Sequence, residues 1–338
     1  MTKVCITVDI ECSIGGAFRD PTLLPVGEKA IWCNVDGRSE GLGFILETMR
    51  AEGLHGTFFL ETNHAHYFGA SPVRDAAVRI HNEGHDTQLH AHPCWAIFKS
   101  NDWRETVLEQ RNADNIGELS VPDIIEIIKH GRRMFDEWQL PDPVVFRSGN
   151  LQHNESMYRA LAQCGLAASS SVGLGIFDSG HAQYQLLSGN HEITGVTEMP
   201  VLSFDDGLNW QSPSMKCLTI AGTSFSETQA LLKQAEAHNI PLVVILTHTF
   251  EFIQKSDNQF AMLRRHAINQ QRFRDLCGFL KENRQRFPCI TMEQATRECK
   301  GQLTGQNTLL QTPFWASAIR KVCNVAYDAY GSFLLKWC

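Results

Sequence analysis

Two hydrophobic patterns alternate along the chain. Short runs rich in β-branched residues predict strands, and longer segments with apolar residues every three to four positions predict helices. The predicted strands cover residues 4–8, 57–60, 86–89, 144–147, 167–172, 198–202, 217–220 and 241–246, and the predicted helices cover residues 41–52, 73–82, 155–164, 226–238, about 259–287 and a segment that begins at residue 120. Nearly continuous apolar strands between helices indicate a parallel sheet covered by helices, either a barrel or a doubly wound sheet. We expect one barrel-like α/β domain.

Polar side chains follow the predicted strands at the points where the strands end. In a parallel α/β barrel, the carboxyl ends of all strands open onto one face, where active sites lie. We therefore expect these residues to converge at one mouth: Asp9, Glu11, Glu61, His90, His92, Arg147, Asn150 and His248.

Four of these residues have the chemistry of a metal site. His90 and His92 can offer two imidazoles to one ion, and Asp9 and Glu11 point to the same side of an extended segment. Two neighbouring carboxylates repel unless a cation lies between them or one keeps its proton. Two histidines and one carboxylate suit a divalent metal, most simply zinc, with nickel, cobalt or iron as alternatives. Cys94 is a further ligand to consider, although a buried place in the wall is favoured.

Arg147 and His248 end two further buried strands. A buried arginine needs a carboxylate or oxyanion partner, and Asp9 is the predicted partner. The imidazole of His248 is a candidate general acid. The residues therefore indicate metal-assisted hydrolysis, in which the metal polarises a carbonyl, a free carboxylate takes a proton from water and a histidine protonates the leaving group.

Composition narrows the class of protein. The 338 residues are 43% hydrophobic and 20% charged, which excludes a disordered or collagen-like chain. The net charge is −7, and no basic stripe is visible, so we expect no nucleic-acid partner. The eleven cysteines are scattered singly, and we find no signal-peptide pattern and no apolar run of membrane-spanning length. We expect a cytoplasmic protein with reduced thiols.

The ordered motifs resemble those of a known family. They are TVDIE at 7–11, TFFLE at 57–61, GHDTQLHAHP at 84–93, FRSG at 146–149 and LTH at 246–248. This set resembles the polysaccharide deacetylases, the NodB-like proteins of carbohydrate esterase family four, from about residue 2 to residue 291. The resemblance implies a distorted (β/α) barrel of about seven parallel strands. It also implies one divalent metal, usually zinc, and removal of N- or O-acetyl groups from a sugar or oligosaccharide.

The resemblance also implies roles in the first two motifs. Asp9 resembles the catalytic base. The family commonly places a metal-binding Asp directly after that base, where this chain has Ile10, so Glu11 is expected to bind the metal instead. His90 and His92 resemble the metal-binding histidines, although their spacing is two positions here where the family commonly has a spacing of four.

The later motifs imply an acid and its supports. Arg147 resembles the residue that orients the base, and His248 resembles the catalytic acid. The acidic residue that often steadies this acid falls at Ser169, so we expect Asp178 or Asp205 to replace it.

We expect the substrate to contact Glu61, Trp95 and Asn150. The leading function is deacetylation of an intracellular carbohydrate, such as a precursor in surface-polysaccharide assembly. Two alternatives remain open. One is hydrolysis of a non-acetyl amide, such as a formamide or a cyclic ureide, by the same metal and base. The other is a catalytically inactive sugar-binding relative, which the altered motifs suggest.

The end of the chain differs from the rest. We expect a barrel domain at residues 1–297 and a linker with an amphipathic helix at residues 298–338. The apolar face of that helix comprises Trp315, Ala318, Ile319, Val322, Val325, Ala326, Tyr330, Phe333, Leu334 and Trp337. Packing against the barrel or a second subunit is the favoured role of this face. The alternative is attachment to a membrane surface that carries a lipid-linked sugar.

Overall fold

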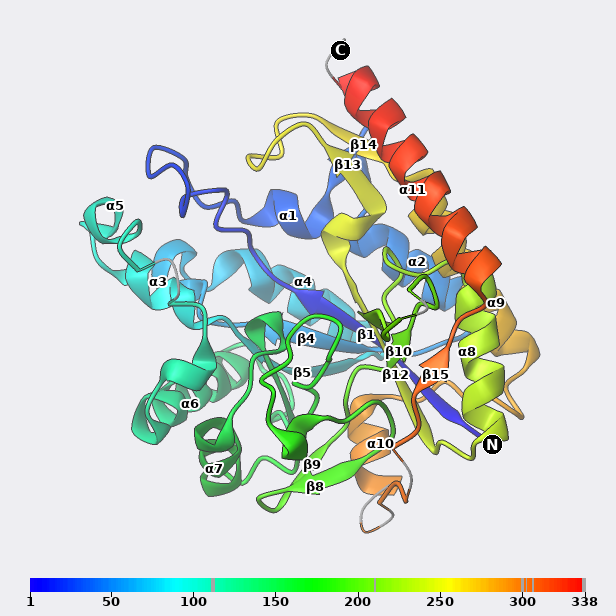
Figure 1. The fold of residues 1–338 in the computed structure, drawn as a ribbon. Coiled ribbons are helices and arrows are strands. Elements are labelled where there is room, and N and C mark those ends of the chain that lie inside the picture. Colours follow the sequence, from blue (N-terminus) through cyan, green and yellow to red (C-terminus); the bar gives the residue numbers. More distant parts are fainter. Residues whose placement is uncertain (111–112, 210, 299–300, 302, 306, 336–338) are drawn as a thin grey trace.

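A curled sheet of eight strands forms the centre of the molecule. The computed structural model describes residues 1–338 except 111–112, 210, 299–300, 302, 306 and 336–338 (Figure 1). In spatial order the strands are β12 (Leu242–His248), β1 (Lys3–Ile10), β4 (Thr57–Glu61), β5 (Asp86–Ala91), β6 (Val145–Ser148), β7 (Ala168–Ser169), β9 (Val196–Glu198) and β8 (His191–Ile193). Seven of them run parallel, and β8 pairs antiparallel with β9. The predicted α/β architecture with about seven parallel strands is confirmed.

The sheet curls until its two ends approach each other. The segment after β9 returns to β12, where Val201 forms a parallel bridge with Val244. The amide of Leu202 donates to the carbonyl of Val244 at 3.1 Å. This contact gives the sheet the distorted-barrel form that the sequence predicts.

Helices cover the outside of the curled sheet (Figure 1). The longer ones are α2 (Leu42–Glu52), α4 (Ser71–Asn82), α6 (Val121–Glu137), α7 (Glu155–Gln163), α8 (Phe225–Ala237), α9 (Ala267–Glu282) and α11 (Phe314–Leu335). The shorter ones are α1 (Glu28–Trp32), α3 (Ala65–Phe68), α5 (Trp103–Thr106) and α10 (Met292–Glu298), with 3₁₀ turns η1 (Pro93–Lys99), η2 (Ile116–Glu118), η3 (Gly149–Leu151), η4 (Ala182–Tyr184) and η5 (Thr249–Phe252). As predicted, Ser120 caps the start of α6, and its side chain accepts from the amide of Asp123.

Three smaller sheets accompany the eight-stranded sheet. They are β2 (Asn34–Val35) with β3 (Arg38–Ser39), β10 (Ser203–Asp205) with β11 (Met215–Cys217) and β15 (Leu310–Gln311), and the hairpin of β13 (Ile253–Lys255) with β14 (Leu263–Arg265). The hairpin corrects the predicted long helix at 259–287, because α9 begins only at residue 267. Phe260 has a left-handed backbone with φ of 55°, which ends any helix at this point.

The alternation of residues along β1 separates the core from the site. Val4, Ile6, Val8 and Ile10 belong to the large apolar cluster that includes the covering helices. The intervening side chains point to the inside of the curl, where Cys5 packs in a second apolar cluster. Asp9 is the last inward-facing residue of β1, and it is 3% exposed.

Helix α11 lies along one side of the molecule, with the chain terminus at its far end (Figure 1). It contacts α8 and the β13–β14 hairpin. Trp337, which is part of the predicted apolar face, lies outside the described residues. The domain boundary at residue 297 stays a prediction. None of the helices that the structure describes is long and apolar enough to cross a membrane.

Candidate metal and catalytic site

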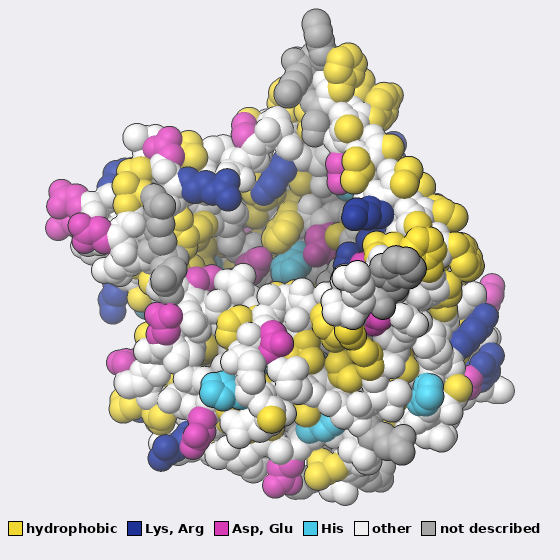
Figure 2. All heavy atoms as spheres, viewed as in Figure 1, with side chains coloured by type: hydrophobic (Ala, Val, Ile, Leu, Met, Phe, Trp, Pro, Cys, Tyr) yellow, Lys and Arg dark blue, Asp and Glu magenta, His cyan; other side chains and the backbone are white. Residues whose placement is uncertain are grey.

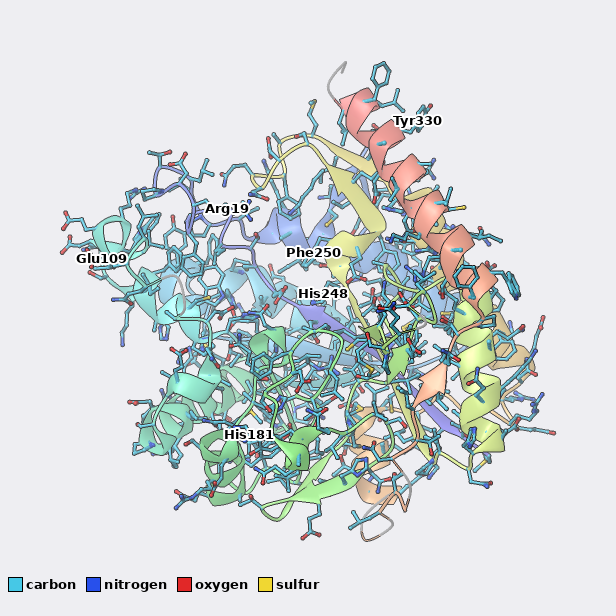
Figure 3. All side chains as sticks on the ribbon, in the orientation of Figure 1. Arg19, Glu109, His181, His248, Phe250 and Tyr330 are labelled. Carbon is cyan, nitrogen blue, oxygen red and sulfur yellow. The ribbon has the colours of Figure 1, made fainter. Side chains whose placement is uncertain are left out.

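The strand register brings the predicted residues to one level at the carboxyl end of the sheet. Asp9 on β1 lies beside His248 on β12, and Glu61, His90 and Arg147 follow one another across β4, β5 and β6. Figure 2 shows a hollow in this face, and Figure 3 shows His248 and Phe250 between β1 and the β13–β14 hairpin.

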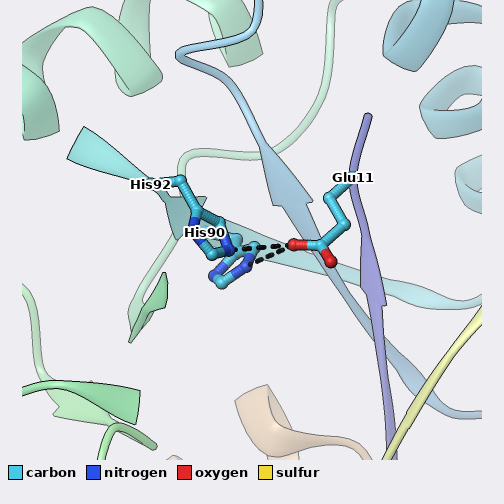
Figure 4. Close-up of side chains that lie close together, drawn as sticks. All are labelled: Glu11, His90 and His92. Carbon is cyan, nitrogen blue, oxygen red and sulfur yellow. Dashed lines mark hydrogen bonds and ion pairs between the residues drawn. The ribbon is translucent and has the colours of Figure 1, made fainter. Parts of the chain in front are cut away.

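Glu11, His90 and His92 form a compact group of metal-ligand side chains (Figure 4). One carboxylate oxygen of Glu11 lies 3.4 Å from Nε2 of His90 and 2.9 Å from Nε2 of His92. One ligand atom from each residue lies within 4.8 Å of the other two. A metal ion bound in place of the protons between these atoms would therefore have three ligand atoms around it.

Both imidazoles are held through their other nitrogen. Nδ1 of His90 donates to the carbonyl oxygen of Arg147 at 2.9 Å, and Nδ1 of His92 contacts Asp114 at 2.8 Å. This leaves each Nε2 directed at Glu11. Anchoring of Nδ1 by an oxygen is the usual support of a metal-binding histidine. One carboxylate and two anchored imidazoles fit a divalent metal such as zinc.

The charges in this group reinforce one another. Burial raises the pKa of Glu11, but the charge of His92 and hydrogen bonds from both histidines outweigh burial and hold that pKa well below its usual value. Burial lowers the pKa of His92, but the charges of Asp114 and Glu11 outweigh burial and raise it well above its usual value. Glu11 is therefore ionised at neutral pH and is ready to bind a cation.

Asp9 and Arg147 form a second, fully enclosed pair. Nη1 of Arg147 donates to Oδ1 of Asp9 at 2.7 Å and to the hydroxyl of Thr7 at 3.0 Å. Ser170 accepts two further hydrogen bonds from the same guanidinium, which lies 4.0 Å from the ring centroid of Phe59. The predicted ion pair of Arg147 with Asp9 is present, and it fixes one of the two carboxylate oxygens.

The other oxygen of Asp9 is less closely held. Oδ2 lies 3.9 Å from Nε2 of His90 and 3.8 Å from Nε2 of His248, both beyond hydrogen-bond distance. Oδ2 therefore faces the space between the candidate metal ligands and His248, where a reacting water can be received.

Glu251 holds His248 in place. Its carboxylate lies 2.9 Å from Nδ1 of His248 and accepts from Thr247 at 2.7 Å. Burial lowers the pKa of His248, but the hydrogen bond and charge of Glu251, with the charges of Glu11 and Asp9, raise it to about 9. His248 is therefore protonated at neutral pH, as a general acid must be.

This arrangement corrects one prediction. The acidic partner of His248 is Glu251, not Asp178 or Asp205. Asp178 accepts from Gly180 and Gln185 in a loop, and Asp205 bonds to Gly207, Ser214 and Gln311 in a separate small sheet. Glu251 lies three residues after His248 in the turn η5, so the support comes from the same segment as the acid.

A cavity of about 230 Å³ opens beside the metal-ligand group. Two of the predicted substrate-contact residues line it, namely Trp95 and Asn150. The rest of the wall is formed by Glu11, Cys12, Ser13, Ile14, His92, Cys94, Asp114, Phe250, Lys255 and Phe260. The Nζ of Lys255 lies 4.2 Å from the ring centroid of Phe260.

Glu61 has a different place from the one predicted. It is fully buried, and its carboxylate accepts from the amides of Asn63 and His64 at 2.7 and 2.8 Å. The amide of His92 approaches the same carboxylate at 3.4 Å. Glu61 thus holds the turn after β4 and the backbone of His92, a position that does not support the predicted contact with substrate.

Asp114 is a site residue that sequence reasoning missed. It contacts His92, accepts from Asn150 at 2.7 Å and faces the amide of Cys94 at 3.4 Å. It lies in an irregular segment well away from the ends of the predicted strands, so the strand-end pattern had no signal for it. His92, Cys94 and Asp114 also form a second group with metal-ligand atoms. Burial raises the pKa of Cys94 to about 12, which favours its place as a neutral wall residue.

Comparisons with known proteins agree with the geometry. Residues 25–169 match the family model of the polysaccharide deacetylases. A structure of a proposed polysaccharide deacetylase from Mycobacterium smegmatis is 14% identical, with a TM-score of 0.52, and the match covers 92% of this chain and 94% of that one. No curated protein matches the chain.

Two further structures show lower similarity. The family 4 carbohydrate esterase of Streptomyces lividans, in complex with acetate, is 12% identical over 91% of this chain and 98% of that one, with a TM-score of 0.43. A family pseudoenzyme of Bacillus anthracis is 12% identical over 87% of this chain and 65% of that one, also with a TM-score of 0.43. The family match over residues 25–169, together with the fold, confirms the predicted resemblance of this chain to the polysaccharide deacetylases.

Proposed function

We propose that this protein is a metal-dependent hydrolase that removes an N- or O-acetyl group from a carbohydrate. The observation that carries this proposal is the convergence of three metal-ligand side chains with a fixed carboxylate and a protonated histidine. Asp9 and His248 both lie within 4 Å of the carboxylate or imidazole atoms of that ligand group. The family match supports the substrate class.

Glu11, His90 and His92 would hold the metal. Bound there, a divalent ion would supply a Lewis acid for the acetyl carbonyl. Zinc is the ion that this donor set fits best, and nickel, cobalt and iron accept the same ligands.

Asp9 acts as the general base in this proposal. Arg147 holds Oδ1, so Oδ2 is the atom that removes a proton from the attacking water. The water oxygen adds to the acetyl carbon as that proton leaves. Because the carboxylate is fixed before the substrate arrives, little reorientation is needed during the reaction.

His248 acts as the general acid. Its Nε2 delivers a proton to the sugar nitrogen or oxygen as the bond from that atom to the acetyl carbon breaks. The products are acetate and the deacetylated sugar. Glu251 keeps the imidazole oriented through Nδ1 and favours its protonated form.

The cavity suits a small acylated sugar ring. Phe250, Phe260 and Trp95 give it apolar walls, on which the apolar face of a sugar can pack. Asn150 and Lys255 bring hydrogen-bond donors to the same cavity.

Metal content and acetate release test the proposal. We expect about one tightly held divalent ion per chain by elemental analysis before and after dialysis against a chelator. The protein should release acetate from N-acetylated or O-acetylated oligosaccharides, His90→Ala should lose the ion, and His248→Ala should keep the ion while turnover falls about 10²–10⁴-fold. A protein that binds acetylated sugars without taking up metal would contradict the proposal and favour the inactive sugar-binding alternative. Metal-dependent cleavage of a formamide or cyclic ureide, without acetate release from sugars, would favour the other hydrolase.

We further infer that the substrate is a cytoplasmic carbohydrate. The cysteines other than Cys5 in the described part of the chain are free thiols, which supports a reducing compartment. Cell fractionation tests this inference, and recovery of the protein outside the cytoplasmic fraction would contradict it.

A further inference from the structure

Helix α11 is attached to the molecule by its polar side. Arg320, which is 5% exposed, donates to both oxygens of the buried Glu227 on α8 at 3.0 and 2.9 Å. Ser317 donates to the same carboxylate at 2.7 Å, and Arg272 on α9 donates to Asn324 at 2.6 Å. Directional polar bonds therefore fix this helix on the body, and the few buried apolar side chains on the same side, such as Ala316 and Leu335, add to them.

The opposite side of α11 is apolar and exposed. Its large side chains are Phe314 (63% exposed), Trp315 (61%), Ile319 (57%), Val322 (69%), Val325 (65%), Tyr330 (59%) and Phe333 (57%). Figure 2 shows hydrophobic atoms running along the helix. An amphipathic helix normally turns this side to the core. The reversed orientation of α11 indicates that its apolar side is covered in the working protein.

We propose that this side is the contact with a second copy of the chain, in which two α11 helices pack antiparallel about a two-fold axis. The area is sufficient. The four aromatic side chains alone present on the order of 500 Å² at these exposures. With the three aliphatic side chains the face approaches the roughly 800 Å² per partner of a standard interface, whereas an unpaired monomer seldom exposes so much.

The spacing along α11 is that of a helix seam. Trp315, Ile319, Val322, Ala326, Ala329 and Phe333 are separated alternately by four and three residues. This is the 3.5-residue period of two packed helices. The period is continuous over most of the helix, which is about 33 Å long at 1.5 Å per residue.

The seam is complementary to itself when two copies run antiparallel. If the two-fold axis crosses the apolar face at the level of residue 324 along the helix, Ile319 faces Ala329 of the partner subunit, and Val322 faces Ala326 of the partner subunit. Each larger side chain then meets a small one, which close packing requires.

The ends of the seam fit the same register. Trp315 meets Phe333 of the partner subunit, next to a groove of about 440 Å³ that Trp315, Ile319 and Phe225 line. The groove gives this large pair the room that the alanine layers do not need.

The mass of the full-length protein in solution tests the proposal. By size exclusion with light scattering we expect twice the 38.0 kDa mass of the chain. Val322→Asp combined with Ala326→Asp should give the single-chain mass, because both layers next to the axis then carry charge. Both positions are exposed, so the fold should persist. The matched control Ile176→Asp, at an apolar residue 47% exposed outside α11, should stay dimeric.

Disulfide trapping tests the direction of the helices. In a background of Cys323→Ser and Cys338→Ser, Val322→Cys with Ala326→Cys should form linked dimers on mild oxidation. Trp315→Cys alone should not, since antiparallel copies of this residue lie about 27 Å apart. Efficient linkage through Trp315→Cys would overturn the antiparallel arrangement.

Two outcomes would overturn the proposed contact itself. One is a wild-type monomer that floats with phosphatidylcholine–phosphatidylglycerol vesicles. The other is a double aspartate variant that is still a dimer.

Discussion

Two buried carboxylate–arginine pairs in this molecule differ in how many of the carboxylate oxygens accept hydrogen bonds. Where α8 meets α11, both oxygens of Glu227 accept from Arg320, and Ser224 and Ser317 supply further bonds. At the mouth of the barrel, Arg147 binds only Oδ1 of Asp9, and Oδ2 lies nearly 4 Å from two histidines.

The difference separates a structural pair from a chemical one. A carboxylate with all its hydrogen-bonding positions filled has nothing left to offer a reactant, and its role is to join two helices. A carboxylate with one oxygen fixed and one oxygen free is positioned and still reactive. Burial and an arginine partner therefore do not by themselves identify a catalytic residue.

The largest expected effect on turnover comes from removing the negative charge of Asp9, whose Oδ2 is not fixed by Arg147. Asp9→Asn should lower turnover about 10²–10⁴-fold, because the amide cannot take a proton from water. The bound metal should be retained, since Glu11, His90 and His92 are unchanged. Acetate release and elemental analysis of the same preparation measure both effects. Loss of the ion would mean that the roles of Asp9 and Glu11 are reversed.

The matching change in the structural pair should act on stability alone. Glu227→Gln leaves Arg320 without its main countercharge in a buried place, which costs roughly 3 kcal/mol in the free energy of unfolding. Denaturant titration measures this loss, and turnover of the folded variant should equal that of the wild type. A comparable drop in turnover would show that α11 influences the site.

The same pair predicts a pH dependence. Burial raises the pKa of Glu227, but hydrogen bonds from Ser224, Ser317 and Arg320 outweigh burial and lower it below its usual 4.5. Its contribution to stability is therefore complete above about pH 4.5 and is lost as the pH falls through the lowered value. The stability difference between wild type and Glu227→Gln should shrink toward pH 3, and a difference that grew on acidification would contradict the assignment.

A smaller effect is expected at the support of His92. Asp114→Asn should weaken metal binding about 10–100-fold, since a ligating histidine loses the carboxylate that orients it. Competition with a chelating dye measures the affinity. Asn115→Asp, at the neighbouring residue that caps η2, is a suitable control and should leave the affinity nearly unchanged.

The smallest expected effect concerns the support of the acid. Turnover of the wild type should decline as the pH rises through about 9, because His248 then loses its proton. Glu251→Gln should move this decline toward the usual histidine pKa of 6.5 and reduce turnover at neutral pH about tenfold. The pH profile of turnover tests this, and a profile unchanged by Glu251→Gln would exclude His248 as the acid.

The sequence predicts the strands and the strand-end residues of this fold well. The strands β1, β4, β6 and β12 have an apolar run followed by a polar residue, whereas β5 has only Leu89 before His90. The level at which Asp9, His90, Arg147 and His248 meet then follows from parallel pairing. Glu61 obeys the same pattern, yet it supports a turn, because the pattern gives the end of a strand and not the direction of the side chain beyond it.

The parts that the sequence did not reveal depend on irregular backbone. Asp114 reaches His92 from a long connection between β5 and α6, whose path no periodicity describes. Glu251 was overlooked although it is close to His248 in sequence, because a 3₁₀ turn was not expected there. The helix predicted at 259–287 was too long for a similar reason, since the hairpin before α9 has apolar residues that also fit a helical period.

Arg147 affects how precisely Asp9 and His90 are positioned relative to each other. Its guanidinium positions Asp9, and its carbonyl oxygen positions His90. One residue is thus the common reference point for the base and for a metal ligand. A small displacement of β6 would carry both groups in the same direction, so the separation between them, on which the attack of water depends, varies less than either position.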